Sequence, residues 1–124
     1  MFELTINGNV YGFNFGMGFM REMNKRISTP VEGLDVKKNI GLQYAVAGIL
    51  DGDVEELVNV LEVANKGQDL RITRQQLDNF IDDKNTDIDK LFDDVLDFLK
   101  RANATKKVTV SLMEELEKRK NQDQ

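Results

Sequence analysis

MFELTINGNVYGFNFGMGFMREMNKR, residues 1–26, is the stretch that decides the fold, because it predicts two strands, a tight turn and the start of a helix. Apolar side chains alternate with polar ones along two runs, namely Phe2, Leu4 and Ile6, then Tyr11, Phe13 and Phe15. A two-residue turn at Gly8-Asn9 would pair these runs as Phe2–Phe15, Leu4–Phe13 and Ile6–Tyr11. An isolated hairpin is marginally stable in water. We therefore expect helices or another chain to cover its apolar face.

The rest of the sequence predicts helices. Apolar residues at helical spacing indicate five of them, at about 17–26, 36–50, 54–65, 74–82 and 87–102. Capping residues support four of the starts, namely Asp35, Asp53, Thr73 and either Thr86 or Asp87. Pro30 ends the first helix, and 27–34 is expected to be a loop.

The predicted fold class is therefore α+β and mostly α-helical, with an N-terminal β-hairpin followed by about five helices in a compact bundle. Residues 1–103 are expected to form this hairpin and helical domain. Residues 104–124 are polar apart from a few apolar positions. They could form a last helix, at about 109–120, or a tail that a partner orders.

The composition excludes several classes of function. The 124 residues contain no cysteine and no histidine, which removes disulfides, thiolate metal sites and the commonest general base. The sequence has neither a secretory signal nor an apolar run as long as a membrane span. We therefore expect a soluble intracellular protein, with no cofactor and no membrane partner.

Charge is distributed unevenly along the chain. Residues 1–99 hold 10 Lys/Arg and 18 Asp/Glu, a net charge of −8, whereas 100–124 hold 7 Lys/Arg and 4 acids, a net charge of +3. Nucleic-acid binding needs clustered positive charge on the folded body. The acidic body therefore argues against a nucleic-acid partner, and the basic tail is too short and too mixed to reverse that.

Three patterns could carry chemistry, and each has a simpler explanation. Asp83-x-Asn85-x-Asp87-x-Asp89 begins like a calcium loop but has Ile88 and Asp94 where such a loop needs glycine and glutamate. Gly16-Met17-Gly18 lacks the third glycine of a dinucleotide fingerprint. The pairs Asp51/Asp53 and Asp82/Asp83 are at positions typical of helix caps and solvated helix ends. We therefore assign no catalytic, cofactor-binding or metal-binding residue.

Two apolar patterns are candidates for partner binding. Methionines are adaptable at surfaces that meet varied apolar partners, and small residues at helical spacing let a second helix approach closely. The candidate partner-binding residues are Tyr11, Phe13, Phe15, Met17, Met20, Met23, Gly41, Ala45 and Gly48. The same residues would serve equally as the core of the domain and as an internal helix crossing, so both interpretations stay open.

These features together resemble the tail assembly chaperones of long-tailed bacteriophages and prophages of Gram-positive bacteria. The resemblance covers roughly residues 1–105. Its strongest parts are Phe2-Glu3-Leu4-Thr5-Ile6-Asn7-Gly8, Tyr11-Gly12-Phe13-Asn14-Phe15-Gly16 and the Met-Gly-Phe-Met-Arg-Glu-Met-Asn-Lys that follows. It continues through Gly41-Leu42-Gln43-Tyr44-Ala45 and the acidic helix at 87–102.

The resemblance implies a non-enzymatic protein of the host cytoplasm that binds the tape-measure protein, keeps it soluble and promotes assembly of the tail tube. It further implies self-association, a possible contact with the tail tube protein, and absence from the mature virion. Such families often make a longer product by translational frameshifting, and Lys106-Lys107 is a place where lysine codons could allow it. The alternative is a small regulatory module that binds another protein. A third hypothesis is an enzyme that uses only carboxylates for catalysis.

Overall fold

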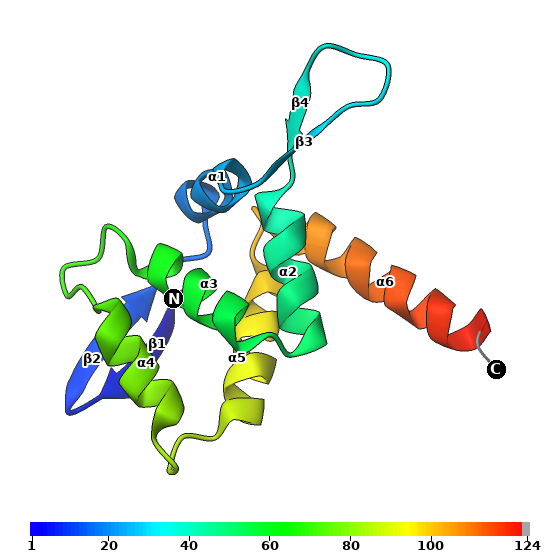
Figure 1. The fold of residues 1–124 in the computed structure, drawn as a ribbon. Helices are drawn as coiled ribbons and strands as arrows, with labels where there is room; N and C mark the ends of the chain where they lie inside the picture. Colours follow the sequence, from blue (N-terminus) through cyan, green and yellow to red (C-terminus); the bar gives the residue numbers. More distant parts are fainter. Residues whose placement is uncertain (123–124) are drawn as a thin grey trace.

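The computed structural model describes residues 1–122, which form two β-hairpins and six helices (Figure 1). The elements are β1 (Phe2–Ile6), β2 (Asn9–Phe13), α1 (Met17–Lys25), β3 (Ser28–Pro30), β4 (Lys37–Asn39), α2 (Gly41–Asp51), α3 (Val54–Asn65), α4 (Arg74–Asp82), α5 (Ile88–Arg101) and α6 (Lys106–Gln122). The predicted class, α+β and mostly helical with an N-terminal hairpin, is confirmed. The sixth helix, α6, occupies the segment for which the sequence left a helix or a tail open. The last two residues of the predicted 104–124 segment lie outside the described residues.

The first hairpin turns one residue earlier than predicted. Asn7 and Gly8 both have positive φ, 53° and 82°, as a tight turn that matches the strand twist requires. The ladder pairs Phe2 with Phe13 and Leu4 with Tyr11, so the predicted Gly8-Asn9 turn and the Phe2–Phe15, Leu4–Phe13 and Ile6–Tyr11 pairs were wrong by two residues. Side-chain direction repeats every two residues. The error therefore left the predicted apolar face correct, and this face is buried except for Leu4, which is partly buried.

The second hairpin was not predicted. Residues 28–39, which we call the arm, pair β3 with β4 where the sequence suggested a loop at 27–34 and a helix from 36. The Ile40 N–H donates to the Ile27 carbonyl oxygen at 2.9 Å. The hairpin pairing therefore extends to Ile40. Helix α2 starts only at Gly41, where the Asn24 side-chain oxygen accepts the N–H of Leu42 at 3.1 Å. Asp35 is thus not the cap of α2.

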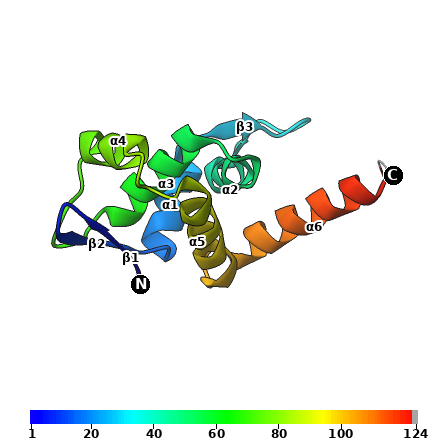
Figure 2. The same ribbon diagram turned by 90° about the horizontal axis from the view of Figure 1, so that it is seen from below.

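Helix α3 forms the centre of the molecule. It contacts α1, α2, α4 and β2, and most of its side chains are buried. The apolar faces of the first hairpin, α1, α2 and α5 meet it in one continuous core. Helix α6 packs against α2 and α5 and then extends away from the body (Figure 2).

A fully buried asparagine joins the hairpin to the helical part. Asn65, the last residue of α3, donates from Nδ2 to the carbonyl oxygens of Gly12 (2.9 Å) and Leu70 (3.1 Å), and its Oδ1 accepts the N–H of Ile72 (2.8 Å). Three backbone groups from two segments therefore share one side chain. Among the described residues, every buried side-chain nitrogen and oxygen has a hydrogen-bond partner.

Candidate partner-binding site

Most of the residues predicted to bind a partner lie in the protein's own core. Tyr11, Phe13, Phe15, Met23, Gly41 and Ala45 are buried. Met20 is half-buried, and its sulfur accepts a hydrogen bond from Asn24. Met17 differs from these, because 47% of its surface is exposed. These positions show that the core interpretation holds for the buried residues, whereas their partner binding stays a prediction.

The small residues of α2 make close contacts within the chain. A Cβ on Gly41 would lie 1.7 Å from the carbonyl oxygen of Met23, so the start of α2 touches the backbone of α1. A Cβ on Gly48 would meet the side chain of Glu56 in α3 at 2.7 Å. The internal helix crossing therefore accounts for both glycines. Their use as a self-association face stays a prediction.

An apolar hollow at the N-terminal end of the fold is the best candidate for a partner site. We call it the N-terminal hollow. Its volume is about 410 Å³, and its lining includes Met1, Phe13, Phe15, Met17, Phe98 and Ala102. Clefts of this size and apolar character are typical of binding sites. Phe13, Phe15 and Met17 are among the candidates that the sequence suggested, whereas Met1 and Phe98 are not.

Aromatic packing fixes one side of the hollow. The ring of Phe98 lies 5.1 Å from that of Phe2 and 6.2 Å from that of Phe15, centroid to centroid, which is within the range of favourable aromatic contacts. The guanidinium of Arg101 lies 4.9 Å from the centroid of Phe98, in the geometry of a cation–π contact. Sequence periodicity placed Phe98 on the apolar stripe of α5 but could not show that this stripe ends at the hairpin.

Met1 and Met17 are the adaptable side chains in the lining of the N-terminal hollow. Met17 is the first residue of α1, directly after the turn that leaves β2, so its side chain begins where the hairpin ends. Met1 is 70% exposed. Methionine side chains are unbranched and polarizable, and they adapt to irregular apolar surfaces. The hollow thus combines a fixed aromatic side with two adjustable side chains.

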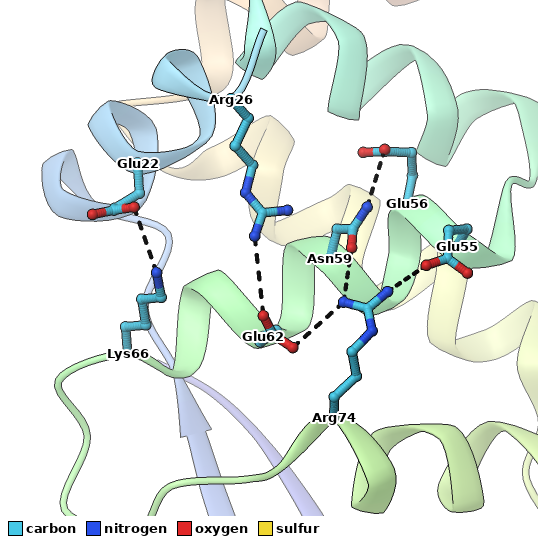
Figure 3. A network of polar contacts seen from close by, with 8 residues as sticks. All are labelled: Glu22, Arg26, Glu55, Glu56, Asn59, Glu62, Lys66 and Arg74. Atoms are coloured by element: carbon cyan, nitrogen blue, oxygen red, sulfur yellow. Dashed lines mark hydrogen bonds and ion pairs between the residues drawn. The ribbon is translucent and has the colours of Figure 1, made fainter.

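Charged side chains near the middle of the molecule pair with one another. Figure 3 shows a network that links α1, α3 and the start of α4, formed by Glu22, Arg26, Glu55, Glu56, Asn59, Glu62, Lys66 and Arg74. Arg74 is its hub, because it contacts Glu55, Glu62 and Asn59. Exposed pairs of this kind contribute little stability each, so we assign the network a role in orienting α4 on α3.

Three of the carboxylates considered for chemistry accept backbone N–H groups. Asp53 accepts the N–H of Glu56 and caps α3, and Asp87 accepts the N–H of Lys90 and caps α5. Both caps are among those that the sequence predicted. Asp83 accepts the N–H of Asn85 at 2.9 Å. No group of three or more potential metal-binding side chains occurs within residues 1–122. None of the helices in the same range is long and apolar enough to cross a membrane.

Comparison with known proteins gives one match. Residues 3–114 match the family model described as phage tail assembly chaperone protein. No curated protein and no solved structure matches the chain. The matched range contains both hairpins, α1 to α5 and the first half of α6.

Proposed function

The chain belongs to the phage tail assembly chaperone family, and we propose that it binds the tape-measure protein of its phage, keeps that protein soluble and promotes tail tube assembly around it. The single observation that supports this role is the N-terminal hollow, with exposed Met17 beside an aromatic wall. We further propose that it acts in the cytoplasm of the bacterial host and is absent from the mature virion.

A helical client suits this hollow. A long helix that is not yet assembled exposes an apolar stripe, and a partner that covers the stripe prevents aggregation. Recognition of this kind places apolar side chains at helical spacing into a groove. The hollow accepts side chains of different shape because Met1 and Met17 can change rotamer while Phe98 stays packed.

The proposed chaperone role requires binding to the client and no catalytic step. A chaperone of this kind needs contacts that form and release, and the carboxylates at the helix starts already serve as caps. The tail tube protein is a second possible partner, reached once the client is bound. A regulatory module would instead bind one small partner and would have no effect on the solubility of a tape-measure protein.

Co-expression with the tape-measure protein of the same phage tests the proposal. We expect the wild-type chain to raise the soluble fraction of that protein and to co-elute with it. Met17→Asp should abolish both effects, because it places a charge in the apolar hollow. It should leave the fold intact, since an aspartate suits the first turn of a helix.

Val54→Asp is the matched control. Val54 is also the first residue of a helix, α3, and is 40% exposed, but it does not line the hollow. The control should behave as wild type. If the soluble fraction of the tape-measure protein is the same with and without the wild-type chain, the chaperone proposal is wrong and the regulatory-module alternative gains support. If Met17→Asp and Val54→Asp behave alike, the hollow is not the site.

A further inference from the structure

The outer edge of β1 has no partner strand in the described part of the chain. The first hairpin is a sheet of two strands, and its tight turn closes on the pair Ile6–Asn9. Because hydrogen-bonded pairs alternate along an antiparallel ladder, the N–H and carbonyl groups of Glu3 and Thr5 point away from β2. Within residues 1–122, no backbone group of another element hydrogen-bonds to them. This edge can therefore accept an added strand.

The outer edge of β2 is covered by the helical part of the protein. The outward carbonyl of Gly12 accepts a hydrogen bond from Asn65, and the N–H of Asn14, just after the strand, donates to the carbonyl oxygen of Ala64 in α3. In both views β1 lies on the side of the hairpin nearer to α5 (Figures 1 and 2). An added strand would therefore pair with β1 and lie on the side of α5.

A groove borders the free edge of β1, and we call it the β1 groove. Its volume is about 490 Å³, and it runs from β1 to α4 and α5. Its lining includes Leu4, Thr5, Phe80, Asp83, Asp87 and Asp94. The groove thus offers the backbone groups of Thr5 on one side, and apolar and acidic side chains on the other.

The groove and its surroundings are acidic. Three of the four charged residues in its lining are aspartates, and the fourth, Lys90, is paired with Asp94 at 2.7 Å. The acidity extends beyond the lining, because residues 82–97 hold seven aspartates and two lysines, a net charge of −5. Glu3 is the only charged residue of β1. A ligand that complements this groove should therefore be basic.

A strand with lysine or arginine at alternate positions fits both properties of the groove. Side chains of an added strand alternate between two faces, so every second residue faces the groove. The aliphatic stem of a lysine or arginine can pack on Leu4 and Phe80 while its charged end reaches the aspartates. Asp83 and Asp87 each accept a backbone N–H, but a carboxylate has room for further donors.

The position of the groove indicates which partner supplies this strand. The N-terminal hollow, which we assigned to the tape-measure protein, lies at the other end of β1 and further along α5. Met1 in the hollow and Leu4 in the groove are three residues apart, which is about 10 Å along a strand. Phe98 in the hollow follows Asp94 in the groove by about one helical turn. A polypeptide that occupies the hollow can therefore reach the groove within a few residues.

We propose that the tape-measure protein is recognised in two parts, an apolar helix in the N-terminal hollow and a short extended segment in the β1 groove. The extended segment pairs with the backbone of Thr5 and carries lysine or arginine at alternate positions. Strand addition to an exposed sheet edge is a common mode of peptide recognition. The inference rests on the proposed function for the identity of the partner, whereas the groove can be tested with a peptide alone.

A designed peptide tests the groove without the client. The probe is a short peptide of alternating lysine and valine, and its control has glutamate in place of each lysine. In NMR titrations of the full chain, the Lys-Val peptide should shift the Thr5 amide and slow its hydrogen exchange. The amide of Val10, which lies opposite Thr5 on β2, should not change. Binding should weaken at high salt, and the Glu-Val peptide should bind about tenfold more weakly or less.

A proline in each strand tests the backbone pairing. Thr5→Pro removes an outward N–H and keeps the hairpin ladder, because Thr5 and Val10 form a pair without hydrogen bonds between them. It should weaken binding of the Lys-Val peptide by about fivefold to tenfold. Val10→Pro is the matched control, since Val10 is 51% exposed and does not line the groove. It should stay within about twofold of wild type, and circular dichroism verifies that both variants are folded.

Neutralising two aspartates tests the charge of the groove. Asp83→Asn with Asp87→Asn keeps side-chain oxygens that can accept the same backbone N–H groups, and it should weaken peptide binding by about threefold to tenfold. The matched control is Asp89→Asn with Asp93→Asn, which changes the net charge equally at two exposed positions of α5 outside the lining. That control should stay within about twofold of wild type.

The complex with the co-expressed tape-measure protein gives the deciding result. Hydrogen–deuterium exchange should show that the Thr5 amide is protected in the complex, and Thr5→Pro should lower the co-eluting fraction of the client more than Val10→Pro does. An unprotected Thr5 amide, equal effects of the two prolines, or equal binding of the two peptides would overturn the inference.

Failure of this inference differs from failure of the proposed function. A client that stays soluble and bound while the Thr5 amide is unprotected leaves the chaperone proposal standing and refutes the β1 groove as a second site. A client that the wild-type chain neither solubilises nor binds refutes the proposed function, and with it the partner named here.

Discussion

Asn65 is the residue whose removal should be most costly for its size. Its side chain is fully buried and makes three hydrogen bonds, all to backbone groups: two carbonyl oxygens and one N–H. Asn65→Ala deletes all three bonds and leaves these backbone groups without their partner. The side chain joins β2 to the segment after α3.

The expected loss follows from those three contacts. At about 1 kcal/mol net for each hydrogen bond, and more where a buried group stays unsatisfied, Asn65→Ala should reduce the free energy of unfolding by about 3–5 kcal/mol. Domains of this size have a total stability of about 5–15 kcal/mol. With a urea m-value near 2 kcal/mol/M, the midpoint should fall by about 2 M.

Urea unfolding followed by circular dichroism measures this shift. Asn59→Ala is the matched control, because Asn59 lies on the same helix but bonds only to the side chains of Glu56 and Arg74. It should cost less than about 1 kcal/mol, as is usual for partly exposed polar contacts. If Asn65→Ala changes stability no more than Asn59→Ala does, the argument that one side chain holds the hairpin on the helical part is refuted.

Further substitutions test the packing of the fold, each by its urea midpoint relative to wild type. Gly41→Ala should destabilise by about 3 kcal/mol or more, because its Cβ would collide with the carbonyl oxygen of Met23 at 1.7 Å; a neutral result would refute the close approach of α2 to α1. Gly18→Ala should stabilise by about 0.5–1 kcal/mol, because a Cβ there meets no atom within 4 Å and alanine favours the helix; destabilisation would mean that the site is more crowded than the structure shows. Thr105→Val should cost about 1–3 kcal/mol, because the buried hydroxyl donates to the Leu99 carbonyl oxygen at 2.6 Å; unchanged stability would show that this bond does not hold the α5–α6 connection.

Local sequence patterns predicted the elements that depend on local chemistry. Thr73 with Gln76 forms the predicted capping box of α4, and Asp53 caps α3. The alternation from Phe2 to Ile6 identified the buried face of the first hairpin. The observed turn is at Asn7-Gly8, which is a preferred two-residue sequence for such a turn, so its position also depends on local chemistry.

The features that were missed depend on contacts distant in sequence. The strands of the arm are three residues each and polar, so they show no alternation. Helix α2 is capped by Asn24, which lies 18 residues before Leu42, and no local motif reveals such a cap. Likewise, Met1 and Phe98 join Phe15 and Met17 only because α5 ends against the hairpin. Periodicity gives the buried face of each element but not its neighbour.

Site-specific photo-crosslinking tests most directly whether the N-terminal hollow is the client site. A photoreactive amino acid at position 17 and, separately, at position 54 would be incorporated in the full chain, which is then irradiated with the co-expressed tape-measure protein. The account predicts crosslinks to that protein from position 17 and none above background from position 54. Equal crosslinking from both positions, or crosslinking from position 54 alone, would contradict it.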